Sequence, residues 1–221
     1  MGSTTDSPTD VTRSSEPNVN DVPGVPDEVN CGQAAGMSPP TQQWHQLQAL
    51  LDKQAIRETL MRYARGMDRH WPELANSAYH HDSWDYHGSF TGRGREFTVT
   101  SAAATRRADP QNQMTHHLLG QTYIELAGDT GLCETYFHCA GIHNDDDTPM
   151  AYHIHGRYLD RVERVGEEWK IRVRRVIVDM SSQGAAGAAW SSAEHYPRGE
   201  RWPKDAVFRF EEMVSFPTST R

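Results

Sequence analysis

The feature that most constrains the fold is a change of hydrophobic period near residue 114. Before it, apolar residues recur every three or four positions, which is the spacing of an amphipathic helix. After it, segments rich in β-branched and aromatic residues are separated by Gly, Asn and Pro turn signals. Helices followed by a run of strands predict an α+β domain, with N-terminal helices packed on one face of a curved, mostly antiparallel sheet.

The same patterns give the expected order of elements. Order should begin near Thr41 or Trp44, with helices over 44–68, 72–79 and 94–108. A short strand is expected at 83–90, and four long strands are expected over 114–127, 131–143, 150–165 and 168–181. Because consecutive long strands are joined by short turns, they should form an antiparallel meander.

Composition divides the chain into three parts. Residues 1–40 contain no Leu, Ile, Phe, Tyr or Trp, so they cannot bury enough apolar area to offset their ordering entropy. We expect a disordered tail there, a folded domain over 41–182 and an extension over 183–221. The alternative for the tail is an arm that wraps a subunit. The extension carries aromatic residues expected to pack on the cavity mouth or a neighbouring subunit: Trp190, Tyr196, Trp202, Phe208, Phe210 and Phe216.

Charge and cysteine content exclude several classes of function. The chain has 22 Lys+Arg against 30 Asp+Glu, so neither nucleic acid nor an anionic membrane is an expected partner. It has no apolar run of about 18–20 residues and no secretory signal pattern, which favours a cytoplasmic protein. Its 3 cysteines have no CxxC spacing, which argues against a disulfide framework or a thiolate zinc site.

An ordered set of short segments resembles the SnoaL-like branch of the nuclear transport factor 2-like superfamily over about residues 45–181. The segments include Tyr63-Ala64-Arg65-Gly66-Met67-Asp68, Gly88-Ser89-Phe90-Thr91-Gly92, His116-His117-Leu118-Leu119-Gly120-Gln121 and Gly156-Arg157-Tyr158-Leu159-Asp160. The resemblance implies a cone-shaped α+β barrel that encloses one deep pocket, usually in a homodimer or homotrimer.

The resemblance also implies a site. Cofactor-independent members, such as scytalone dehydratase, bile-acid 7α-dehydratase and hexachlorocyclohexane dehydrochlorinase, use a His–Asp dyad in the pocket. Matched by position, the dyad is Asp68 and His117, with adjacent His116 as the alternative histidine. The accompanying tyrosine and arginine match Tyr63 and Arg174. No cofactor is implied.

The expected chemistry follows from these residue types. A histidine can take or give a proton near neutral pH, and a carboxylate on its other ring nitrogen fixes its tautomer. Tyr63 would donate to a substrate oxygen, and Arg174 would stabilise negative charge. Five residues separate Tyr63 from Asp68, roughly 140° apart on a helix. Both can face one cavity only if the helix ends near Asp68, which Gly66 favours.

Further candidates come from the histidine-rich strands. The substrate pocket is predicted to include His116, His138, Tyr79, Trp84, His87 and Tyr136. Two histidines and a carboxylate could instead hold a metal, since His153 and His155 share a strand face, as do Asp85 and His87. No HExxH pattern occurs, and the resemblance implies no metal. His117 and Tyr63 could also be ordinary core residues, and Arg174 could lie on a solvated strand face.

These observations favour a lyase that acts on a hydrophobic, aromatic or polycyclic hydroxylated molecule of the kind met in aromatic compound catabolism. Dehydration and retro-aldol carbon–carbon cleavage, such as deformylation, need the same proton transfers. The alternatives are a non-catalytic ligand-binding or scaffold protein, or a small subunit of a ring-hydroxylating dioxygenase. No GxGxxG, Walker A or GxSxG motif occurs, which argues against nucleotide-dependent and serine-hydrolase chemistry.

Overall fold

The computed structural model describes residues 40–108, 115–145, 148–187 and 199–209. The described residues from Thr41 onward form one compact unit. The predicted tail over 1–40 lies outside the described residues except for Pro40. So do four aromatic residues of the predicted C-terminal extension: Trp190, Tyr196, Phe210 and Phe216.

The element order agrees with the prediction: two helices, a short strand segment, a third helix and then four long strands. The elements are α1 (Pro40–Asp68), α2 (Pro72–Ser77), β1 (Tyr79–His87), β2 (Phe90–Gly92), α3 (Gly94–Ala108), β3 (His116–Ala127), β4 (Thr130–Asp145), β5 (Thr148–Val165), β6 (Glu168–Ala185) and the 3-10 helix η2 (Ala206–Arg209). No helix among the described residues is both long and apolar enough to cross a bilayer.

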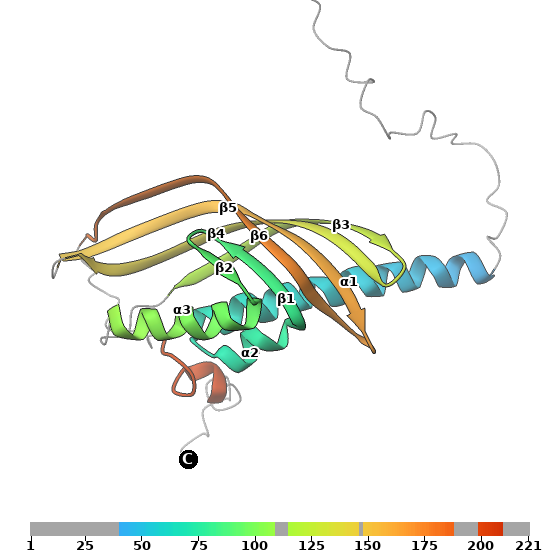
Figure 1. Ribbon diagram of the computed structural model, residues 1–221, viewed down its shortest axis with the longest axis horizontal. Coiled ribbons are helices and arrows are strands. Elements are labelled where there is room, and N and C mark those ends of the chain that lie inside the picture. Colours follow the sequence, from blue (N-terminus) through green and yellow to red (C-terminus); the bar gives the residue numbers. More distant parts are fainter. Residues whose placement is uncertain (1–39, 109–114, 146–147, 188–198, 210–221) are drawn as a thin grey trace, which may run out of the picture. The chain divides into compact units, whose positions relative to one another are not determined.

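The strands form a single curved sheet in the order β2-β1-β6-β5-β4-β3. Neighbouring strands are antiparallel except β1 and β6, which are parallel. The helices lie on one side of the sheet, facing its concave surface (Figure 1). The predicted α+β architecture, with N-terminal helices packed on a curved and mostly antiparallel sheet, is therefore confirmed.

The start of the sheet differs from the sequence prediction. Tyr79 was expected at the end of the second helix but is the first residue of β1. Helix α2 ends two residues earlier than expected, at Ser77, because the Ile171 N–H of β6 donates to the Ala78 carbonyl at 2.9 Å and aligns the segment with the sheet. The single strand expected at 83–90 is a hairpin of β1 and β2, with Gly88 at a φ of 64° in the turn.

Side chains alternate between a covered and an open face of the sheet. On β4, Cys133, Phe137 and Cys139 face the helices and are buried, whereas Leu132 and Tyr136 face outward and are 59% and 41% exposed. Residues on the covered face pack with the C-terminal half of α1 and with α2 to form the core. A shift of one residue in a strand therefore decides whether a side chain reaches the interior.

The two halves of α1 have different environments. Apolar side chains in its first half are exposed: Trp44, Leu47, Leu50 and Leu51. Burial begins at Asp52, whose carboxylate accepts a hydrogen bond from the Trp169 indole at 3.2 Å and pairs with Arg164 at 2.6 Å. Figure 1 shows the first half of α1 extending beyond the sheet. Only the second half of α1 is therefore in a position to contribute to a site.

Gly66 lets α2 approach α1 closely. A Cβ atom at Gly66 would lie 2.4 Å from the Ala75 backbone nitrogen, so no larger residue fits without displacing α2. The helix itself continues to Asp68, and the chain then turns at His70, which has a φ of 49°. The helix therefore ends at Asp68, near where the sequence required it to end, and Gly66 acts through its close contact with α2. The turn that follows directs the chain into α2 below the sheet.

Candidate active site

A cavity of about 670 Å³ lies between the sheet and the helices. Its walls come from the end of α1, the α1–α2 turn, α3, and the neighbouring ends of β1, β3, β4, β5 and β6. Most of the wall is apolar, with Met67, Trp71, Phe97, Ala102 and Ile154 among its residues. This volume lies in the ordinary range for small-molecule pockets, about 300–1,000 Å³.

Asp68 and His117 meet at the wall of this cavity. The Asp68 Oδ1 and His117 Nδ1 atoms are 2.5 Å apart, and the His117 backbone N–H donates to both carboxylate oxygens at 3.0 Å. Both side chains are about nine-tenths buried, with exposed fractions of 10% and 11%. Because Nδ1 is engaged by Asp68, Nε2 is the ring nitrogen left to exchange a proton with a ligand.

Burial and hydrogen bonding act on His117 in opposite directions. Burial favours the neutral ring, but the hydrogen bonds with Asp68 and Cys139 and the negative charge of Asp68 favour the protonated ring more strongly. Together they raise the pKa of His117 to about 9. The ring is therefore an imidazolium at neutral pH and is ready to donate a proton.

Two cavity residues beside His117 were not predicted from the sequence. Cys139 is the direct cross-strand partner of His117 in the β3–β4 register, and its thiol contributes to the raised pKa of both His117 and Tyr152. All three residues line the cavity. The sequence indicated His138, one residue before Cys139, because it does not show which side chains of the strand face inward. The β3–β4 pairing, which places Cys139 opposite His117, is known only from the structure.

Tyr63 and Arg174 lie side by side, but only Tyr63 lines the cavity. Arg174 is fully buried behind it and forms a two-armed ion pair with Asp160, at 2.8 Å through Nε and 2.7 Å through Nη2. Its guanidinium lies between the rings of Tyr63 and Tyr158, at 4.1 and 4.0 Å from their centroids. Arg174 therefore supports the cavity wall from behind.

Two predicted pocket residues on β1 also lie on the covered face of the sheet. Tyr79 does not line the cavity but is completely buried next to Tyr63, with the two rings edge-on at 5.6 Å, and its hydroxyl donates to Asp85 at 2.5 Å. His87 lines the cavity, and its ring stacks on Phe97 at a centroid distance of 3.9 Å. Asp85 was not predicted as a pocket residue. Its carboxylate lies next to both the Tyr79 hydroxyl and the His87 ring.

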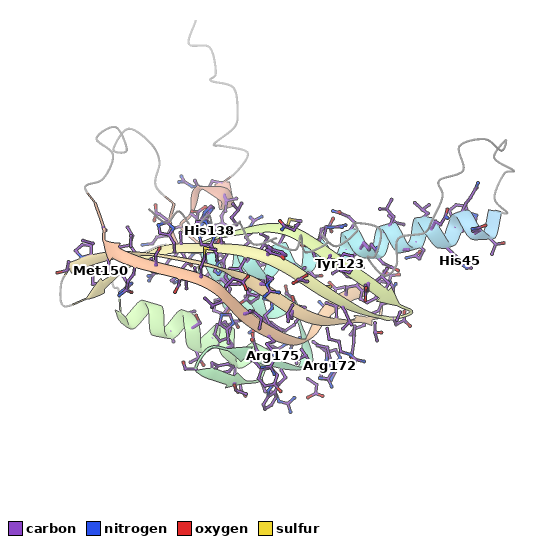
Figure 2. All side chains as sticks on the ribbon, turned by 90° about the horizontal axis from the view of Figure 1, so that it is seen from above. His45, Tyr123, His138, Met150, Arg172 and Arg175 are labelled. Carbon is purple, nitrogen blue, oxygen red and sulfur yellow. The ribbon has the colours of Figure 1, made fainter. Side chains whose placement is uncertain are left out.

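The structure does not bring the other four predicted pocket residues into the cavity. His116, His138, Trp84 and Tyr136 occupy strand positions whose side chains point to the open face of the sheet. Figure 2, which views the sheet from the side opposite the helices, labels His138 on that face. In each case a neighbour one position along the strand faces inward instead, because side chains alternate with a period of two. His117 is the inward member of the His116–His117 pair.

The histidines of the open face pack against one another. His138 Nε2 and His153 Nδ1 are 3.0 Å apart, and the His138 ring stacks on His155 at a centroid distance of 4.3 Å. Within the described ranges, no set of three or more His, Cys, Asp or Glu side chains is arranged to hold a metal ion. The alternative metal hypothesis therefore has no geometric support in this part of the chain.

The described part of the C-terminal extension packs beside the cavity. Trp202 stacks on Trp71 at a centroid distance of 5.7 Å, and Phe208 meets the same ring edge-on at 5.2 Å. Trp71 is itself a cavity residue. The Trp202 N–H also donates to the Arg69 carbonyl at 2.8 Å, which ties the segment to the turn after α1.

Comparison with known proteins agrees with this geometry. A family model described as SnoaL-like domain matches residues 48–175. A hexachlorocyclohexane dehydrochlorinase from Novosphingobium barchaimii is 18% identical, with a TM-score of 0.56 over 66% of this chain and 97% of that chain. A candidate scytalone dehydratase from Novosphingobium aromaticivorans is 20% identical, with a TM-score of 0.51 over 64% of this chain and 93% of that chain. These structural likenesses show a shared fold. No curated protein matches the sequence.

Proposed function

Because the chain belongs to the SnoaL-like domain family, we propose that its cavity is the active site of a cofactor-independent lyase. The observation that carries the proposal is the Asp68–His117 pair, joined at 2.5 Å in the wall of a largely apolar cavity of about 670 Å³. The proposed substrate is a hydrophobic, hydroxylated aromatic or polycyclic molecule. Its rings would contact the apolar wall, and its reacting oxygen would lie at His117 Nε2.

In this mechanism His117 acts first as an acid. Its Nε2–H is transferred to the substrate oxygen that leaves or that gains negative charge, and Asp68 holds the opposite ring nitrogen in place. In a dehydration the C–O bond breaks and its electron pair remains on the oxygen, which departs as water once protonated. In a retro-aldol cleavage a C–C bond breaks instead, and the acid protonates the resulting enolate.

Tyr63 is proposed to orient the substrate. Its hydroxyl is buried in the wall and makes no well-aligned hydrogen bond with any described residue, so a substrate oxygen would satisfy it. Burial raises the pKa of Tyr63, which keeps the phenol protonated and able to donate. The guanidinium of Arg174 holds the ring in position.

A turnover screen tests the proposal directly. EDTA-treated protein is incubated with hydroxylated diaryl, steroid and polycyclic compounds, and the products are identified by mass spectrometry. The expected result is loss of water or of a small carbonyl fragment from one class of compound. Tight binding without turnover would favour the non-catalytic ligand-binding alternative, and activity abolished by EDTA would refute cofactor independence.

The raised pKa of His117 predicts the pH dependence of the reaction. If His117 works as an acid, kcat/KM is retained while the ring is protonated and falls about tenfold per pH unit above pH 9. In Asp68→Asn this alkaline limb should move to lower pH, because the charge that favours the imidazolium is gone. The measurement is a profile of kcat/KM between about pH 6 and pH 10. Activity that rises through pH 9 would show instead that His117 acts as a base.

We further propose that the chain forms a homodimer or homotrimer through the open face of the sheet. Large apolar side chains are exposed there, including Leu118 at 60%, Tyr123 at 65% and Met180 at 64%. Leu118→Asp should lower the molecular mass in sedimentation, whereas Val99→Asp, at a 51% exposed position on α3, should not. A wild-type protein that sediments as a monomer would refute this association.

A further inference from the structure

His87 has a position in the cavity that the proposed dyad does not use. It lies at the end of β1, whereas His117 lies at the start of β3, and β6, β5 and β4 separate these strands in the sheet. At about 4.8 Å between neighbouring strands, the two histidines enter the cavity from distant parts of its wall. The curvature of the sheet nevertheless lets both line the same cavity.

A buried carboxylate, Asp85, lies beside the Nδ1 atom of His87, although it is farther away than Asp68 is from His117. His87 Nδ1 is buried without a hydrogen-bond partner among the described residues and is 3.6 Å from Asp85 Oδ1, which is equally unpartnered. The other carboxylate oxygen of Asp85 accepts the Tyr79 hydroxyl at 2.5 Å. A movement of roughly half an ångström would bring the His87 and Asp85 atoms to hydrogen-bond distance. The side of His87 away from Asp85 would then face the cavity.

The buried layer behind His87 carries a surplus of negative charge. Asp85 and Asp160 are both completely buried there, and Arg174 is the cation beside them. The Arg174 guanidinium donates two hydrogen bonds to Asp160. Among the described residues, His87 is the group that could pair with Asp85 as a cation, at 3.6 Å, and a proton arriving on His87 would compensate the charge of Asp85.

We propose that His87 and Asp85 form a second acid–base pair that binds and deprotonates a phenolic hydroxyl at the end of the substrate remote from His117. This inference rests on the proposed function and narrows its substrate class to hydroxyaryl compounds with a second oxygen across the ring. Phe97, which stacks on His87, would contact the same ring. Asp85 is a positioning residue here, since it acts through His87.

The two pairs together account for a complete elimination. His87 takes the phenol proton, and the O–H electron pair becomes a carbonyl π bond. The ring electrons shift to form a double bond to the benzylic carbon, whose C–O bond breaks with its electrons on oxygen. That oxygen takes the proton of His117 and leaves as water. The product is a quinone methide, and solvent later removes a proton from His87 and returns one to His117.

Ligand binding tests this inference without requiring turnover. The probes are 4-hydroxybenzophenone, which offers a phenol and a remote carbonyl oxygen, and 4-methoxybenzophenone, which lacks the acidic proton. Wild-type protein should bind the hydroxy probe roughly 10-fold or more tightly than the methoxy probe, because a hydrogen bond with a charged group is lost. The bound hydroxy probe should show the red-shifted ultraviolet band of a phenolate.

Single substitutions distinguish the Asp85–His87 pair from the Asp68–His117 pair. His87→Gln should abolish the preference for the hydroxy probe, and Asp85→Asn should abolish the phenolate band while the fold persists by circular dichroism. His81→Gln, at an exposed position on the same strand, is the matched control and should change neither. His117→Gln should weaken both probes equally and keep the preference.

Three results would overturn the inference: an unchanged preference in His87→Gln, no phenolate band in wild-type protein, or no binding of either probe. The outcome is distinct from that of the turnover screen. A protein that binds the hydroxy probe through His87 but converts no compound would refute the proposed lyase and leave this binding site standing.

Discussion

Replacement of His117 by Gln, or of Asp68 by Asn, is expected to lower kcat by about 100-fold or more on any compound that the wild-type protein converts. His117 carries the transferred proton, and Asp68 fixes its ring through Nδ1. In Asp68→Asn the charge that stabilises the imidazolium is lost, and one of the two oxygens facing the His117 backbone N–H becomes an amide nitrogen. The ring then loses both its preferred tautomer and its orientation.

The adjacent histidine provides a matched control. His116 is on the same strand but points to the open face of the sheet, so His116→Gln should retain wild-type kcat. Steady-state kinetics of the three variants on the same substrate, with circular dichroism to verify folding, makes the comparison. Equal activity in wild type, His117→Gln and Asp68→Asn would refute the dyad.

Replacement of Arg174 by Met is expected to reduce the free energy of unfolding by about 3–5 kcal/mol, the largest stability effect that we predict. The substitution leaves the Asp160 carboxylate buried at zero side-chain exposure without its ion-pair partner. It also removes the cation held between the Tyr63 and Tyr158 rings. Urea unfolding followed by fluorescence measures the change.

The free energy of unfolding lost in Arg174→Met should depend on pH in one direction. Burial raises the pKa of Asp160, and without Arg174 the main influence that opposes this rise would be lost. A carboxyl group whose folded-state pKa exceeds its unfolded value stabilises the fold only while it is protonated, so the loss should shrink as the pH is lowered.

Arg172 is a control for Arg174, because it has the same charge but is less buried. Arg172 lies two residues earlier on β6 and pairs with Asp82 and Glu163, but its side chain is 30% exposed. Surface pairs contribute about 0–1 kcal/mol, so Arg172→Met should cost far less than Arg174→Met. Similar losses in the two variants would contradict the stated role of the buried pair.

The sequence alone determined the class of fold and the boundaries of most elements, because these depend on local patterns. The period of apolar residues separated the helices from the long strands, and Pro72 located the start of α2. The resemblance to the SnoaL-like family also implied Asp68 and His117 as a pair, and the structure brings them together. Where the local pattern was weak, as in the polar segment His80-His81-Asp82, the start of a strand was missed.

Only the tertiary structure decided which strand side chains enter the cavity. His138 and Tyr136 face outward, and their neighbours Cys139 and Phe137 face inward. The distance in sequence from a motif cannot establish the register of a strand to within one residue, so it cannot show which of two neighbours faces the cavity. The β3–β4 pairing contains a register shift between Leu119 and Thr122, which breaks any simple alternation along the strand. The sequence also could not show which buried charged residues lie next to one another. Asp160 and Asp85 become the neighbours of Arg174 only because β5 and β1 flank β6 in the sheet, and strand order is a property of the whole fold.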